Sequence, residues 1–326
     1  MRIRSPELQY LQTLCCRVDL NEEEQYQLSN LEQGYNGEQQ LDQVMSCLSV
    51  QPSLQMDDIT ISYKDQVVQI DKLFSIGQTI YLVDAKCYRG TYSFQAGSWY
   101  HDQKILTHNI FSQIDRARDI LARILEDNQV SMPIKTLIVF INPNSRILLD
   151  DSAVNTVKKL GEFADFVEEV IVNDRSNYSF DWRPTIRKYT IPSYKPKQDY
   201  SSHTKGSMKT GICCYHCHKF NLEQKRSSFY CKSCGQIEAK EQAYVRTICD
   251  YGVIFFKQKL KPRNLATFFG PAYSKRYICM MLKKHFRPAL GNAKTHGYEN
   301  KGLQFRYWFA DKTEFFRKIR VREQWK

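Results

Sequence analysis

The chain has 326 residues, a length typical of two or three domains, and its 42% hydrophobic and 13% aromatic content excludes a disordered chain. Its longest apolar run, residues 137–141, is too short to cross a bilayer, and its N-terminal stretch lacks the apolar region of a secretory signal, so we expect a cytoplasmic protein with no membrane partner. Residues 1–200 hold 21 Lys and Arg against 27 Asp and Glu, whereas residues 201–326 hold 26 against 8. The basic C-terminal third is expected to attract polyanions, most commonly nucleic acid.

A helical pattern is the first clear element of the N-terminal half. Four apolar residues recur at helical spacing: Leu41, Val44, Met45 and Leu48. They predict a helix over about 37–48, with Gly34 and Gly37 in a loop that leads into it.

Strand patterns follow this helix. β-rich runs between residues 59 and 88 predict successive strands joined by turns, and a long amphipathic helix is predicted over 110–125. A buried strand at 135–141 and a last strand at 167–172 complete an α/β sandwich. The stretch from about 175 to 210, rich in Pro, Ser, Tyr and Lys, is predicted to be a linker.

Asp71 and Asp84 are predicted to face each other across a hairpin. Gly77 and the residue after it can form a two-residue turn, because glycine readily adopts the positive φ that such turns need. The register that follows pairs Asp71 with Asp84 and Gln69 with Lys86, all on one face of the sheet. Two opposed carboxylates repel each other unless a cation or a proton lies between them, so we expect a divalent metal ion there. Lys86 could then hold a scissile phosphate or orient the attacking water, whose pKa the metal lowers.

Glu38 is a third candidate carboxylate. It lies three residues before Leu41 and seven before Met45, so it shares their apolar face. A glutamate on a buried face is costly unless it is paired or binds something, which suggests that Glu38 points at the same metal. Each of these acids taken alone is more often a solvated residue at the end of an element, and it is their combination that favours a site.

Several short motifs resemble the nuclease-related domain, NERD, of the PD-(D/E)xK nuclease superfamily: Gly34-x-x-Gly37-Glu38, Gln69-Ile70-Asp71, Asp84-x-Lys86 and Gln113. The resemblance covers about residues 30–145 and implies a restriction-endonuclease-like mixed sheet flanked by helices, with DNA as the substrate. It implies that Glu38, Asp71 and Asp84 hold Mg²⁺ or Mn²⁺, that Lys86 is catalytic with them, and that Gln113 supports them. The family more often has Glu in place of Asp84 and Asn-Pro in place of His108-Asn109, and neither change removes a metal ligand.

Two Cys-x-x-Cys pairs with 13 residues between them predict a zinc ribbon that binds one structural zinc ion through Cys214, Cys217, Cys231 and Cys234. Four protein ligands leave no open position for a catalytic water. Redox exchange and chance pairing of buried thiols are the weaker alternatives. Cys213, His216 and His218 lie close to the first pair but are left out of the ligand set, because four cysteines complete the coordination shell. The remaining cysteines are expected to be ordinary thiols.

The basic C-terminal third is predicted to be a helix–turn–helix or winged-helix-like module. A helix is expected over about 239–257, two shorter ones over 262–270 and 274–286, and a β-wing over 291–309, before a basic tail. The second short helix has outward basic residues that are expected to meet phosphates and base edges: Lys275, Arg276, Lys283 and Lys284. The alternative is a solvated basic face on a small helical bundle.

We therefore expect an α/β nuclease-like domain at 1–175, a linker at 176–210, a zinc ribbon at 211–238 and a basic winged-helix-like domain at 239–326. The predicted function is a Mg²⁺- or Mn²⁺-dependent DNA endonuclease whose ribbon and basic module bind the DNA. One alternative is a DNA-binding or regulatory protein with a nuclease fold and little activity, and another is an adaptor that binds protein through the ribbon. The intact set of Asp71, Asp84 and Lys86 favours the enzyme.

Overall fold

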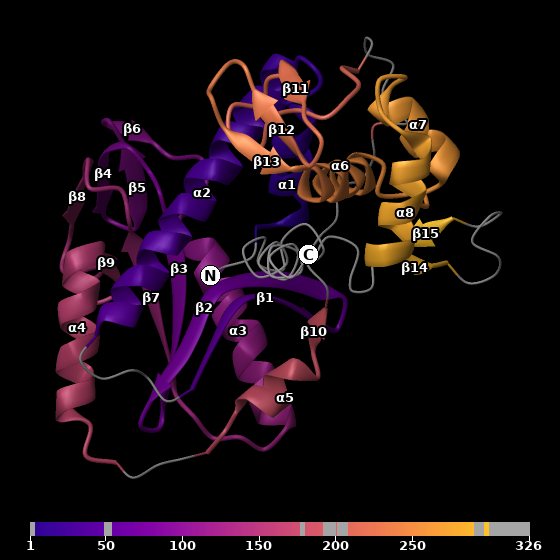
Figure 1. The fold of residues 1–326 in the computed structure, drawn as a ribbon. Coiled ribbons are helices and arrows are strands. Elements are labelled where there is room, and N and C mark those ends of the chain that lie inside the picture. The colour runs from indigo at the N-terminus through magenta and orange to yellow at the C-terminus, as the bar shows by residue number, and fades with distance from the viewer. Residues whose placement is uncertain are drawn as a thin grey trace. The chain divides into compact units, whose positions relative to one another are not determined.

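The computed structural model describes residues 4–48, 54–176, 180–191, 200, 208–289 and 297–299 (Figure 1). The chain divides into two compact units. Asn30–Ser193 form the first, here called the sheet unit, and Met1–Ser29 with Tyr194–Lys326 form the second, here called the ribbon unit. The division falls inside helix α2 (Glu22–Cys47).

The sheet unit is built on a mixed sheet. In its described part, six strands follow the order β10–β1–β2–β3–β7–β9. Their bounds are β1 Leu54–Tyr63, β2 Gln66–Ile76, β3 Thr79–Lys86, β7 Ile134–Phe140, β9 Val157–Lys159 and β10 Thr190–Ile191. The pairs β3–β7 and β7–β9 are parallel, and the other neighbours are antiparallel. A mixed sheet was predicted, and the structure confirms it.

A smaller sheet extends from the end of β3. Four described strands follow the order β6–β5–β4–β8, with β4 at Gly90–Gln95, β5 at Ser98–His101, β6 at Lys104–Ile105 and β8 at Ser145–Leu149. Strands β4 and β8 are parallel, whereas β4–β5 and β5–β6 are antiparallel. Because β4 follows β3 and β8 follows β7, this sheet lies beyond the C-terminal ends of those two strands.

The hairpin of β2 and β3 has the predicted register. Gly77 has a φ of 55°, and the ladder from Ile76↔Thr79 to Lys72↔Val83 is the one that a two-residue turn imposes. Continued by one position, this ladder places Asp71 opposite Asp84.

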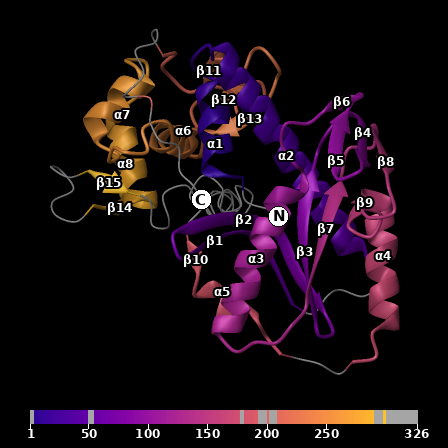
Figure 2. The ribbon, with the colours of Figure 1, turned by 180° about the vertical axis from the view of Figure 1, so that it is seen from behind.

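Helices cover both faces of the main sheet. One face packs against α3 (Phe111–Asp127) and α5 (Arg183–Arg187), and the other packs against the C-terminal part of α2 and against α4 (Leu160–Asn173) (Figures 1 and 2). The two apolar cores are separate because alternate side chains of each strand point to opposite faces. Among the described residues, no helix is long and apolar enough to cross a membrane.

The structure differs from the predicted elements in three places. The segment 167–172, expected to be a strand, belongs to α4, because Phe163 and Val167 are buried on one side at helical spacing. Gly34 and Gly37, expected in a loop, lie inside α2. A side chain at Gly37 would meet Cys87 and Ile141 at 3.4 Å, so this glycine allows the helix to approach the sheet closely.

The third difference concerns the predicted linker. Residues 183–191 form α5 and β10, and β10 pairs with β1 at the edge of the main sheet. Trp182 and Ile186 are fully buried in the core beneath α3. This part of the expected linker therefore belongs to the sheet unit, and 192–199 and 201–207 lie outside the described residues.

The ribbon unit is arranged around helix α6 (Lys240–Ile254), whose residues 241–254 are all buried. A three-stranded sheet of β11 (Leu222–Gln224), β12 (Ser228–Cys231) and β13 (Ile237–Ala239) leads directly into it. Helix α1 (Pro6–Leu14) packs on α6 through its buried leucines. The N-terminal 29 residues thus group with the C-terminal part of the chain, whereas the expected first domain, 1–175, placed them with the sheet unit. No local sequence pattern predicts a contact between segments so far apart in the chain.

Helices α7 (Pro262–Phe269) and α8 (Lys275–His285) also contact α6 and each other, as expected for a helix–turn–helix. The Ser274 side chain caps α8 by accepting a hydrogen bond from the Tyr277 amide. A short hairpin of β14 (Arg287–Pro288) and β15 (Tyr298–Glu299) follows. The rest of the predicted wing, residues 291–296 and 300–309, and the basic tail lie outside the described residues.

Candidate functional sites

The C-terminal end of β3 and its neighbours bring together an acid–lysine cluster. Asp84 and Lys86 come from β3 and Gln113 from the first turn of α3. The Lys86 ammonium lies 2.7 Å from Asp84 Oδ2 and donates a hydrogen bond of 2.9 Å to Gln113 Oε1. Only 7% of the Asp84 side chain and 12% of the Lys86 side chain are exposed, so this ion pair is largely shielded from water. The three residues act as one unit, in which Asp84 and Gln113 hold the ammonium in place.

Asp71 of β2 lies against this unit. Its Oδ2 accepts a hydrogen bond of 2.8 Å from the Ala85 amide, next to Asp84. Burial, together with the charges of Asp84 and Glu38, raises the pKa of Asp71 to about 8. Burial also raises the pKa of Asp84, although the neighbouring Lys86 opposes the rise. Such mutual repulsion among carboxylates is what a bound divalent cation relieves.

Glu38 of α2 is near enough for its charge to act on Asp71. The three carboxylates nevertheless do not form a closed cluster. Over the described residues, the sole group of three or more His, Cys, Asp or Glu whose ligand atoms all lie within 4.8 Å of one another is made of cysteines. The carboxylate oxygens are hard ligands of the kind that Mg²⁺ and Mn²⁺ prefer, so the donor set fits either ion.

Gln69, predicted on the same face, does not join the cluster. Its side chain is exposed and donates a hydrogen bond of 2.9 Å to Asp58 Oδ1. Asp58, its partner, has a φ of 47° and lies between the ladder pairs Asp57↔Lys72 and Ile59↔Ile70.

Lys72 is a member of the site's surroundings that the sequence did not single out. It is 2% exposed, and its ammonium pairs with Asp57 and, at 3.0 Å, with Asp42 Oδ1. Asp42 lies one helical turn after Glu38 on α2, and Lys72 follows Asp71 on β2. Lys72 thus holds the helix that bears Glu38 against the strand that bears Asp71. The sequence signal that could have indicated this role is a single lysine among the apolar residues of a predicted strand.

Residues 33–141 match the family model of NERD, the nuclease-related domain. This segment is similar to the nuclease-related domain, and it is here called the NERD domain. It runs from α2 to the strand after α3 and contains all five predicted nuclease residues: Glu38, Asp71, Asp84, Lys86 and Gln113. Comparisons of the chain with curated proteins and with solved structures find no match. The NERD domain occupies most of the sheet unit, and the ribbon unit lies outside the matched residues.

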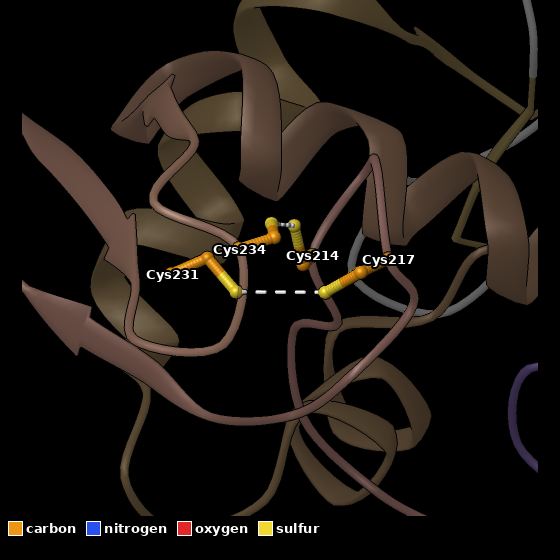
Figure 3. Close-up of side chains that lie close together, drawn as sticks. All are labelled: Cys214, Cys217, Cys231 and Cys234. Atoms are coloured by element: carbon orange, nitrogen blue, oxygen red, sulfur yellow. Dashed lines mark hydrogen bonds between the residues drawn. The ribbon is translucent and has the colours of Figure 1, made fainter.

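The second candidate site is the cysteine cluster of the ribbon unit, which consists of the four predicted cysteines (Figure 3). The Sγ atoms of Cys214 and Cys234 lie 3.6 Å apart, as do those of Cys217 and Cys231. A tetrahedral zinc site with Zn–S bonds of about 2.3 Å has sulfurs about 3.8 Å apart, whereas a disulfide needs about 2 Å. The cluster therefore fits one zinc ion and does not fit a disulfide.

Tight turns direct the cysteines inward. His218 donates its amide hydrogen to the Cys214 carbonyl at 3.0 Å, and Gly235 donates to the Cys231 carbonyl at 2.8 Å. Burial alone would raise the pKa of Cys231, but backbone amides of Ser233 and Cys234 and the neighbouring thiols lower it to about 6. A thiol that ionises readily is suited to metal binding.

A buried charge network fixes this ribbon to α6. Arg246 donates from Nε and Nη2 to the two oxygens of Glu238 at 2.9 and 2.8 Å, and to the Cys213 carbonyl at 2.6 Å. The Cys213 Sγ atom lies 3.7 Å from Arg246 Nη1 and is not part of the four-cysteine cluster. Asp250 lies 3.6 Å from Arg246 and from Arg17, which enters from the N-terminal segment and donates to the Gly211 carbonyl at 3.0 Å. The Arg17 guanidinium also lies over the Phe268 ring of α7.

The predicted DNA-contacting residues of α8 differ in their surroundings. Lys275, Arg276 and Lys283 are exposed. Lys284 is also exposed, but its ammonium lies 2.7 Å from Glu241 Oε1 of α6, which also contacts His285 Nε2 at 2.6 Å. Lys284 therefore joins α8 to α6, and of the four predicted residues it is the least available to a ligand.

Proposed function

We propose that the NERD domain is a metal-dependent DNA endonuclease that hydrolyses phosphodiester bonds with Mg²⁺ or Mn²⁺. The observation that supports it best is the shielded Asp84–Lys86–Gln113 unit beside Asp71, inside a domain whose family model describes it as nuclease-related. Asp71, Asp84 and Glu38 would hold the metal, which would supply an activated water and neutralise charge on the phosphate.

Lys86 would bind a non-bridging phosphate oxygen, since its ammonium has donors beyond those directed at Asp84 and Gln113. Asp84 orients the Lys86 ammonium, and Gln113, which can only accept from the ammonium through its oxygen, fixes the direction of the side chain. The site's low exposure strengthens each of these interactions.

In the ribbon unit, the exposed Lys275, Arg276 and Lys283 would bind DNA phosphates, and the cysteine cluster would hold one structural zinc ion. Because all described cysteines are free thiols, a reducing compartment such as the cytoplasm suits the protein. The same basic helix favours a second candidate, a DNA-binding protein whose NERD domain cuts little or not at all.

Supercoiled plasmid incubated with Mg²⁺ or Mn²⁺ distinguishes the two functions. We expect wild type to nick and linearise it, and Asp84→Ala and Lys86→Ala to lower the rate by about a hundredfold or more, because each removes a transition-state contact. Lys135→Ala is the matched control. It removes an exposed lysine at the start of β7, opposite Tyr81, whereas Lys86 lies opposite Phe140 at the other end of the same pair of strands. Equal slow nicking by all four proteins would reject the nuclease and favour the binder.

A further inference from the structure

The outer face of the zinc ribbon carries aromatic, apolar and basic side chains that zinc binding and packing on α6 do not require. Strand β12 alternates strictly, with Phe229 and Cys231 buried and Tyr230 turned to the opposite side. The ladders pair Tyr230 with Glu223 on one side and with Ile237 on the other, so these three side chains form a row across the sheet. The buried side faces α6, where Phe229 contacts Tyr244. The row therefore lies on the face turned away from the core of this unit.

Apolar and aromatic side chains are exposed around this row. Ile237 is 61% exposed and Tyr215 is 43% exposed. The Tyr215 hydroxyl donates a hydrogen bond of 2.6 Å to Gln236 Oε1, which places its ring beside the start of β13. The His216 ring lies next to it, with the two ring centroids 6.4 Å apart. Tyrosine and isoleucine side chains exposed to this extent on so small a sheet indicate a contact surface.

The charges around these side chains are mostly positive. The exposed basic residues of the ribbon are Lys219, Lys225, Arg226 and Lys232. Its acids are weakened as competitors for a polyanion, because Glu238 is buried by Arg246 and Glu223 lies 3.9 Å from Lys232. Lys225 places its ammonium 5.2 Å from the Tyr230 ring centroid, so a positive charge and an aromatic ring are held together.

We propose that this face, defined by Tyr215, Tyr230 and Ile237 with Lys225 and Arg226, binds single-stranded DNA. Unpaired bases stack on tyrosine rings, which is not possible within an intact duplex, and the flanking lysine and arginine contact the phosphates between them. A protein partner would pack on the apolar side chains, but it would not require the lysine that is held over the Tyr230 ring. The inference deepens the proposed function and rests on it for the choice of DNA as the polyanion.

The test measures binding of the full-length protein to fluorescein-labelled oligonucleotides by anisotropy. Asp84→Asn serves as the background, because it prevents cutting without a chelator that would also remove zinc. The probes are an oligothymidylate, a duplex of the same length and an RNA of the same sequence. In this background Tyr215→Ala should weaken oligothymidylate binding by roughly 5- to 150-fold, the range expected for loss of one stacked base, and should leave duplex binding unchanged. Lys225→Gln should weaken oligothymidylate binding and reduce the salt dependence of that binding.

Tyr26→Ala is the matched control, since Tyr26 is 71% exposed in the same unit and belongs to α2 and not to the ribbon sheet. Zinc content is measured for each variant, and Tyr215→Leu replaces Tyr215→Ala if zinc is lost. Unchanged oligothymidylate affinity in Tyr215→Ala and Lys225→Gln, an equal loss of duplex affinity in Tyr215→Ala, or tighter binding of the RNA would each overturn the proposal. If single-strand binding holds while plasmid is not cut, only the proposed nuclease activity fails.

Discussion

The two units of this protein bury charge in opposite ways. In the NERD domain, Asp71 and Asp84 lie close together, the Lys86 ammonium pairs with Asp84, and the pKa values of both carboxyls are raised. In the ribbon unit, buried arginines and acids alternate, so that Arg246 has Glu238 and Asp250 as partners. An excess of one charge in a shielded place is typical of binding and catalytic sites, whereas a balanced network is typical of structural elements.

The largest expected effect is the loss of zinc from the ribbon unit while the NERD domain stays folded. Cys231→Ser should abolish zinc binding and unfold the ribbon, because a structural zinc contributes on the order of 10 kcal/mol to the fold of so small a module. Zinc stoichiometry by atomic emission and hydrogen exchange of β12, β13 and α6 report the loss, and β2 and β3 in the NERD domain should keep their protection. Cys47→Ser is the control, since Cys47 is an exposed thiol of α2. One equivalent of zinc in Cys231→Ser would contradict the assignment.

Arg246→Met should have the next largest effect. It leaves Glu238 and Asp250 buried without a full set of partners, and breaking a buried pair in this way costs about 3–5 kcal/mol. Faster exchange of α6 and lower zinc retention are expected, with plasmid nicking preserved if the NERD domain folds independently. Arg263→Met is the control, because Arg263 near the start of α7 is exposed and its loss leaves no buried acid without a partner. Equal stability of the two variants would show that the buried network contributes little.

Lys72→Met tests charge burial in the NERD domain. Asp42 and Asp57 are partly exposed, so water can replace the lost ammonium, and we expect a destabilisation of only about 1–3 kcal/mol. Because Lys72 positions Glu38 relative to Asp71, the Mn²⁺ concentration needed for half-maximal nicking should rise more than the maximal rate falls. Lys72→Arg should partly restore it. A fall in rate with unchanged Mn²⁺ dependence would reduce Lys72 to a packing residue.

The smallest expected effect is on the stability of the ribbon unit at low pH. Lys284 and His285 keep the pKa of Glu241 below its ordinary value of 4.5, although burial opposes them. The stability that Glu241 contributes is therefore fully present above pH 4.5 and is lost as the pH falls through its lower folded value. Unfolding of Glu241→Gln between pH 3 and 6, followed by the fluorescence of the chain, should show a shallower loss of stability on acidification than wild type. If the free energy of unfolding changes with pH equally in Glu241→Gln and wild type, the Glu241 carboxylate does not stabilise the packing of α8 on α6.

Predictions from the sequence succeeded where short-range rules apply. The Gly77 turn determines the β2–β3 register, and through it the opposition of Asp71 and Asp84. The spacing of four cysteines predicts their cluster, and capping and periodicity predict α7 and α8. In each case the deciding interactions lie within about 20 residues of one another along the chain.

Tertiary structure decided what these rules could not. The valine-rich segment at 167–172 suits a strand or a helix equally, and it is a helix because one face packs on Phe74 and the sheet around it. Arg17 reaches a carbonyl 194 residues away, so its place in the ribbon unit leaves no local pattern. Lys284 looks like its basic neighbours on α8 until Glu241 of another helix is brought beside it. Composition and spacing thus determined which chemical groups the protein has, and packing between distant segments determined which of them are free to act.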